Sequence, residues 1–292
     1  MSSYRPHDSN VVRDFMLWLF DVPHGEPYVS VSLDITWENA ARYLDTLNAA
    51  APGAAPSSAG NDVRVGPHHL FTAAIGRVYK EFPSINARIH GRKIYRLDAV
   101  DVVMPVNLLG SEADRELSMV IVRGVDKLDP RGVAAALRSQ IVSERKGRPA
   151  NAAVRTLTDF GSRSTTALSF TLRSLATLAH DPRTAPLLTR AFPVSTLITN
   201  VGAAMGTLNG ARFRAVAFSP PTKLVHIGSV IGLGPIDRQP IVDGDTIRIA
   251  PVLPIGFIFD HRLVDGVLAS RILGRLADIL QDPAAHWPSR KP

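Results

Sequence analysis

The stretch FDHRLVDG, residues Phe259 to Gly266, is the most informative part of the sequence. It joins an apolar run typical of a buried strand, at 254–260, to the amphipathic pattern of a helix at 265–281. His261 lies on the turn between them, and histidine suits general-base chemistry because it titrates near neutral pH. Asp265 lies at the expected helix start, where free amides stabilise a carboxylate. Taken alone, the stretch fits a catalytic turn and a capping aspartate beside an incidental histidine equally well.

Hydrophobic periodicity predicts elements along the rest of the chain. Period-two alternation predicts a strand at 28–35, and helical spacing predicts helices at 37–48 and 129–144. A further helix is expected from Pro67 until just before Phe82-Pro83. The continuous apolar run at 117–125 indicates a strand in the centre of a sheet. Other strands are expected at 93–96, 98–107, 194–200, 212–218, 223–231 and 245–250.

The remaining local patterns concern turns, loops and helix faces. Asp243-Gly244 predicts a hairpin turn, and the small, Pro- and Gly-rich residues 49–62 predict a flexible loop. Two or three helices are expected within 152–192. Together with the strands, these elements indicate a mixed sheet of α+β or α/β class. The apolar stripe of the C-terminal helix is expected on Val267, Leu268, Ile272, Leu276, Ile279 and Leu280.

Composition excludes several classes of function. The 292 residues are 45% hydrophobic and 20% charged, which is typical of a globular protein. Cysteine is absent, so a disulfide scaffold, a thiolate metal site and a cysteine nucleophile are excluded. The formal net charge of +7 permits a phosphate-bearing ligand, but the basic residues are scattered and do not favour nucleic-acid binding.

The chain shows neither a membrane-spanning stretch nor a signal peptide, which favours a cytoplasmic protein. His68-His69 lacks a third ligand at suitable spacing, so we expect no metal.

DHRLVDG resembles the DHRxxDG signature of dihydrolipoyl acyltransferases, the core subunits of 2-oxoacid dehydrogenase complexes. It is also similar to the HHxxxDG signature of chloramphenicol acetyltransferase. Four further segments resemble family patterns in the same order: KEFPSINARIHGRKI at 80–94 (KEFPxLNAxxxxxxI), VRGVDKLDPRGVAAAL at 122–137 (IRxADxxSLxxLA), LITNVGAAMG at 197–206 (FTISNLG) and FSPPTKLVHIGSVIG at 218–232 (INPPQxAILGVGAI).

The resemblance implies a chloramphenicol-acetyltransferase-like α+β fold, a two-layer sandwich of a mixed sheet with flanking helices. Residues 1–292 would form one catalytic domain, with neither a lipoyl domain nor a subunit-binding domain. Two features depart from the family pattern. ELSMVIV at 116–122 replaces the usual GLxVPVI, and an apolar helical insertion is expected at about 150–190.

The resemblance also implies a catalytic site. His261 would be the general base, and Thr199, at the place of a family serine, would donate its hydroxyl to the oxyanion. Asp265 would hold the local geometry through Arg262 or Arg13. The residues expected to contact substrate are Arg262, Asn200 and Gly202.

Three hypotheses of function follow from this resemblance. The first is acyl transfer between coenzyme A and a thiol such as dihydrolipoamide, with the lipoyl group carried on another protein and without a metal. The second is a repurposed acyltransferase acting on an amine or hydroxyl of a small molecule or lipid. The third is a non-catalytic trimeric scaffold, which the intact residues His261, Asp265 and Thr199 disfavour.

The resemblance implies a homotrimer whose base and hydroxyl come from different chains. The partners it implies are a lipoyl-domain protein or other 2-oxoacid dehydrogenase subunits. Larger cages of the family use an apolar C-terminal anchor, whereas the tail here, DPAAHWPSRKP, offers one large apolar residue, Trp287, beside basic residues. Burying those charges would be costly, so we expect assembly to stop at three chains.

Overall fold

A computed structural model gives the fold, and the residues that it describes are 27–49, 63–90, 93–107, 117–145, 165–181, 183–184, 192–202, 214, 220 and 226–288. Within these ranges, no helix has both the length and the apolar character needed to span a bilayer. The same residues contain no group of three or more side chains arranged to hold a metal ion.

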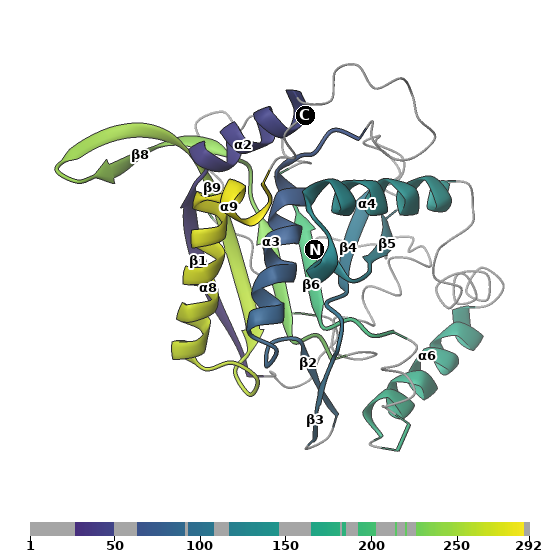
Figure 1. The fold of residues 1–292 in the computed structure, drawn as a ribbon. Helices are drawn as coiled ribbons and strands as arrows, with labels where there is room; N and C mark the ends of the chain where they lie inside the picture. Colours follow the sequence, from purple (N-terminus) through teal and green to yellow (C-terminus); the bar gives the residue numbers. More distant parts are fainter. Residues whose placement is uncertain are drawn as a thin grey trace, which may run out of the picture.

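A seven-stranded mixed sheet forms the centre of the molecule (Figure 1). Its strand order is β1-β9-β7-β6-β4-β5, and β8 pairs with the first half of β9. The pairs β4–β6 and β6–β7 are parallel, and the other pairs are antiparallel. The strands are β1 (Tyr28–Thr36), β4 (Val102–Asn107), β5 (Leu117–Val122), β6 (Thr196–Asn200), β7 (Ser229–Leu233), β8 (Asp237–Asp243) and β9 (Thr246–Asp260), with a separate ribbon of β2 (Ala87–His90) and β3 (Lys93–Arg96).

Helices cover one face of this sheet (Figure 1). They bury the residues that alternate toward that face along the strands, among them Ile198, Ile231 and Phe257. The residues between them, such as Val230 and Ile258, form a second apolar cluster on the opposite face. The helices are α2 (Glu38–Ala49), α3 (Pro67–Glu81), η1 (Val125–Lys127), α4 (Pro130–Arg145), α6 (Thr165–His180), α8 (Gly266–Gln281) and α9 (Pro283–His286).

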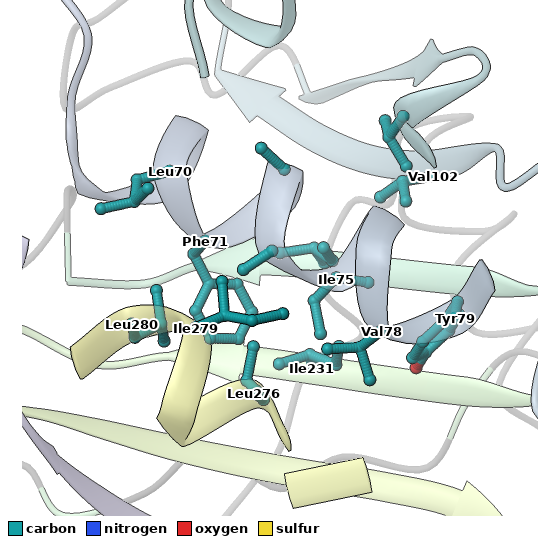
Figure 2. Packing of buried hydrophobic residues seen from close by; sticks show 14 of the residues in the cluster. Leu70, Phe71, Ile75, Val78, Tyr79, Val102, Ile231, Leu276, Ile279 and Leu280 are labelled. Carbon is teal, nitrogen blue, oxygen red and sulfur yellow. The ribbon is translucent and has the colours of Figure 1, made fainter. Parts of the chain in front are cut away.

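The main core lies where α3 and α8 pack together over β7. Phe71 and Ile75 of α3 meet Leu276 and Ile279 of α8, with Ile231 of β7 below them (Figure 2). All five side chains have at most 1% of their surface exposed. Burying a side chain of this size contributes about 1.5–3 kcal/mol. This packing fixes α8, and therefore the turn that precedes it, against the sheet.

Most of the predicted helices are confirmed, as is the α+β class with its mixed sheet and flanking helices. The helix predicted at 37–48 is α2, and it buries the side on which Ala40, Tyr43, Leu44 and Leu47 recur. The α3 helix begins at Pro67 and ends before Phe82-Pro83 as expected. The hairpin at Asp243-Gly244 is also confirmed, since Gly244 adopts a positive φ of 58° between β8 and β9. Strand β8 itself was not among the predicted strands.

Several strand predictions were wrong. The run at 117–125 ends as β5 at Val122, and β5 lies at the end of the strand order instead of its centre. Its apolar run is explained by α4, which packs against β5, and by the second cluster, which buries Ile121. The strands expected at 245–250 and 254–260 are one strand, β9.

Other predictions fail at element boundaries or lie outside the described residues. The strand expected at 98–107 begins at Val102, and the one expected at 223–231 begins at Ser229. Val267 is 74% exposed, so it is not part of the buried stripe of α8. Most of the strand predicted at 212–218 and most of the loop at 49–62 lie outside the described residues. The same holds for most of the insertion at about 150–190, but its described part contains an expected helix, α6.

Candidate active site

His261 lies on the turn between β9 and α8, with its side chain exposed. Its backbone N–H donates to the carbonyl of Pro27, at an N···O distance of 2.8 Å. Further along the turn, the backbone N–H groups of Leu263 and Val264 both donate to the carbonyl of Asp260. The main chain around His261 is therefore fixed, while its imidazole is accessible to a reacting group.

The carboxylate of Asp260, directly before His261, is the centre of a buried hydrogen-bond network. Asp260 has none of its surface exposed. Its Oδ2 lies 2.8 Å from Nε2 of His226, and its Oδ1 accepts the backbone N–H of Arg262 at 2.9 Å. The Arg262 guanidinium donates to both carboxylate oxygens, with an Nη2···Oδ2 distance of 2.6 Å.

These contacts set the charge of Asp260. Burial by itself raises the pKa of this carboxyl, but the hydrogen bonds from His226 and from Arg262 outweigh it and hold the pKa well below its usual range. Asp260 is therefore ionised at neutral pH, and its negative charge is held at the base of the turn that carries His261.

Asp265 acts as the N-cap of α8. Its Oδ1 accepts the backbone N–H of Leu268 at 2.8 Å, which satisfies one of the free amides of the first turn. Arg262, one of the two expected partners of Asp265, instead pairs with Asp260. The other, Arg13, lies outside the described residues. The capping role proposed for Asp265 from its position is present in the structure.

Thr199 lies near the end of β6 and is half-buried. It pairs with Gly232 of β7, which in turn pairs with Gly256 of β9. His261 is five residues beyond Gly256, just past the end of β9, and a strand rises about 3.3 Å per residue, so the Cα atoms of Thr199 and His261 lie roughly 15 Å or more apart. One chain therefore does not bring Thr199 and His261 together.

Both regions match one family model. The family model of the 2-oxoacid dehydrogenases acyltransferase catalytic domain matches residues 157–287, which include the Thr199 strand and the His261 turn. The resemblance to the catalytic core of dihydrolipoyl acyltransferases is confirmed.

Two curated relatives come from Bacillus subtilis (strain 168). The dihydrolipoyllysine-residue acetyltransferase component of its pyruvate dehydrogenase complex is 33% identical over 116 residues, which are 40% of this chain and 24% of the relative. The succinyltransferase component of its 2-oxoglutarate dehydrogenase complex is 23% identical over 224 residues, 76% of this chain and 41% of the relative. The chain thus spans less than half the length of these relatives.

Solved structures show the same fold. A probable dihydrolipoamide acetyltransferase from Listeria monocytogenes 4b F2365 superposes with a TM-score of 0.68 at 14% identity, covering 99% of both chains. A chloramphenicol acetyltransferase superposes with a TM-score of 0.52 at 11% identity, covering 94% of this chain and 96% of the other. At such identities the likeness concerns the fold, and it confirms the chloramphenicol-acetyltransferase-like α+β architecture.

The dihydrolipoyl acyltransferase pattern also assigned contacts to Asn200 and Gly202. Asn200 is half-buried and pairs with Leu233 in the sheet. The amide of Gly202 donates to the carbonyl of Leu233 at 3.2 Å. A Cβ atom on Gly202 would lie 2.4 Å from the carbonyl oxygen of Gly234, so only glycine fits this close approach of two backbones. Gly202 therefore has a structural role, and contact with substrate remains a prediction for both residues.

One member of the buried network, His226, was not predicted from the sequence. It lies in the segment 218–232, where the pattern INPPQxAILGVGAI carries leucine at the corresponding place. His226 is 34 residues from Asp260, so no local spacing connects the two. A histidine within the otherwise apolar run LVHIG was the available signal, because a buried polar side chain requires a partner.

Proposed function

We propose that this chain is a CoA-dependent acyltransferase that moves an acyl group between coenzyme A and a thiol such as that of dihydrolipoamide. The observation that carries the proposal is the His261 turn: an exposed imidazole on a main chain fixed by buried bonds, within the DHRLVDG signature. The family match over 157–287 supports the same chemistry.

The proposed reaction needs one base and one oxyanion donor. His261 takes the proton of the attacking thiol while the sulfur of that thiol bonds to the thioester carbonyl carbon. The carbonyl oxygen becomes an oxyanion, to which the hydroxyl of Thr199 donates a hydrogen bond. When the intermediate collapses, the original carbon–sulfur bond breaks and His261 returns its proton to the leaving thiolate.

We infer that the site is shared between copies in a homotrimer. Thr199 and His261 lie roughly 15 Å or more apart in one chain, too far to act on one carbonyl carbon. A second copy that brings its Thr199 to the exposed His261 of the first would complete the site. Closed rings of identical subunits repeat one such interface at every contact.

We further propose that assembly stops at the trimer. Trp287 is only 7% exposed, and its ring lies under the Arg77 guanidinium, 4.7 Å from the ring centre. Its carbonyl accepts the hydroxyl of Tyr43 at 3.1 Å. Trp287 is thus bound within its own chain and is not free to anchor a neighbouring trimer. The proposed particle mass is about three times the 31.6 kDa of one chain, and light scattering measures it.

The proposed partners and location follow from the reaction. Coenzyme A is a substrate, and the lipoyl group arrives on a lipoyl-domain protein of a cytoplasmic 2-oxoacid dehydrogenase complex. The relatives include an acetyltransferase and a succinyltransferase, so acetyl-CoA and succinyl-CoA are the two acyl donors to compare.

A direct assay with purified protein tests this proposal. Each acyl-CoA is incubated with dihydrolipoamide, and release of free coenzyme A and formation of the acyl-dihydrolipoamide are followed together. Turnover by the parent protein that disappears in His261→Ala supports the proposal. Turnover with amine or hydroxyl acceptors alone would favour a repurposed acyltransferase. A folded trimer inactive with every acceptor would favour a scaffold.

A further inference from the structure

His226 is a buried histidine that the reaction above does not use. Its exposed fraction is 4%, and its Nε2 lies 2.8 Å from Oδ2 of Asp260, the residue directly before His261. The ring comes from the segment before β7, far from the catalytic turn in sequence. It therefore joins the segment before β7 to the residue that precedes the proposed base.

The hydrogen bonds of His226 determine its tautomer. The backbone N–H of Ile89 in β2 donates to Nδ1 of His226 at 3.1 Å. Nδ1 must therefore carry the lone pair, and Nε2 must carry the hydrogen that it donates to Asp260. The pair is a neutral imidazole donating to an ionised carboxylate, a charge-assisted hydrogen bond.

The Asp260 carboxylate passes this constraint to the catalytic turn. Its Oδ1 accepts the backbone N–H of Arg262, so the residues on both sides of His261 are joined through one buried side chain. The backbone of Asp260 is held as well, because its N–H donates to the carbonyl of Gly228 at 3.0 Å. Oδ2 faces His226 and the guanidinium of Arg262. The Arg262 side chain is 42% exposed, so the buried imidazole is the better protected of the two donors.

We propose that His226 is a positioning residue for His261, acting through Asp260. The Ile89–His226–Asp260 chain of hydrogen bonds fixes the direction in which the turn presents the imidazole of His261. The inference rests on the proposed function, because that function makes His261 the catalytic base. The hydrogen bonds themselves are independent of the proposed function. A misplacement of about 1 Å in a reacting group can reduce a rate by about 100-fold, so such a contact can affect turnover without touching substrate.

Two substitutions separate positioning from folding. His226→Leu introduces an apolar side chain of similar bulk and removes the donor to Asp260. His226→Gln keeps one donor and one acceptor. His69→Leu is a matched control, because His69 is also buried and its Nδ1 also accepts a backbone N–H, that of Gly66, but it lies on α3 away from the turn.

The expected result is a loss of kcat without a loss of substrate affinity. His226→Leu should lower kcat by about 10- to 100-fold and change KM by less than about threefold, because the acyl-CoA contacts are unchanged. His226→Gln should recover most of the rate. His69→Leu should keep its kcat even if its melting temperature falls. Wild-type kcat in folded His226→Leu would overturn the inference while leaving the proposed function in place.

If the parent protein shows no acyl transfer, that result counts against the proposed function alone. A second measurement then still tests the role of His226. In protein labelled with ¹⁵N-histidine, His226 should give a protected Nε2–H resonance that is coupled to an unprotonated Nδ1. In His226→Leu, the His261 ring resonances should broaden or split as the turn samples more than one arrangement. Unchanged His261 resonances, or a His226 proton on Nδ1, would contradict the positioning role.

Discussion

The turn that carries His261 and the strand end that carries Thr199 contain different parts of the proposed chemistry. Around His261, the carboxylate of Asp260, its backbone and the following amides are all bonded within one chain. Thr199 is held in the sheet by its pairing with Gly232. The sheet keeps the two regions roughly 15 Å or more apart. Each region is therefore rigid and incomplete, which is the arrangement expected when two copies supply one site.

Removing the imidazole should have the largest effect on turnover. His261→Ala is expected to lower acyl transfer by at least about 100-fold, the lower range for a positioned acid–base group. The fold should be retained, because the side chain is exposed and its backbone bond to Pro27 needs no imidazole. Steady-state rates and circular dichroism check both statements. Parent-like turnover by the folded variant would remove His261 from the mechanism.

The hydroxyl at the other region should matter almost as much. Thr199→Val removes the donor at nearly constant volume and is expected to lower kcat by about 100-fold, with KM changed much less. Thr199→Ser keeps the hydroxyl and should keep most of the rate. Equal rates for Thr199→Val and the parent would show that the oxyanion donor lies elsewhere and that this region is only a strand end.

The N-cap aspartate should show the smallest effect, mainly on stability. Asp265→Ala removes the bond to the amide of Leu268 and is expected to cost about 1 kcal/mol in the free energy of unfolding. Asp265→Asn keeps the cap and should cost a few tenths of a kcal/mol at most. Denaturant unfolding compares the two. A loss of rate in Asp265→Asn with unchanged stability would instead indicate a role for the charge in the site.

The sequence was most informative where a pattern is local. The amphipathic spacing of residues 37–48 predicted the buried face of α2, and DHRLVDG predicted the turn between a buried strand and a helix. The position of β5 was not predictable in this way. An apolar run looks the same in a central strand and in a strand at the sheet's end that is covered on both faces, as β5 is by α4 and by the cluster around Ile121.

Long-range relations account for the other failures. Two strands were predicted at 245–250 and 254–260, yet β9 continues through Pro251 and Pro254. The strand changes its partners there, from β8 to β1 and β7, so two missing N–H groups are tolerated. The His226–Asp260 bond joins residues that no periodicity relates. The separation of Thr199 from His261 required the strand register as well.

Mixing two inactive variants tests most directly whether the site is shared between copies. His261→Ala and Thr199→Val are each purified, then unfolded and refolded together at equal concentrations, with each variant refolded alone as the control. In a trimer, an interface is intact when one chain supplies His261 and its neighbour supplies Thr199. Random assembly gives such interfaces about a quarter of the time, so about a quarter of the parent activity should return. Activity in the mixture no higher than in the separate variants, despite a confirmed mixed trimer, would contradict a site built from two copies.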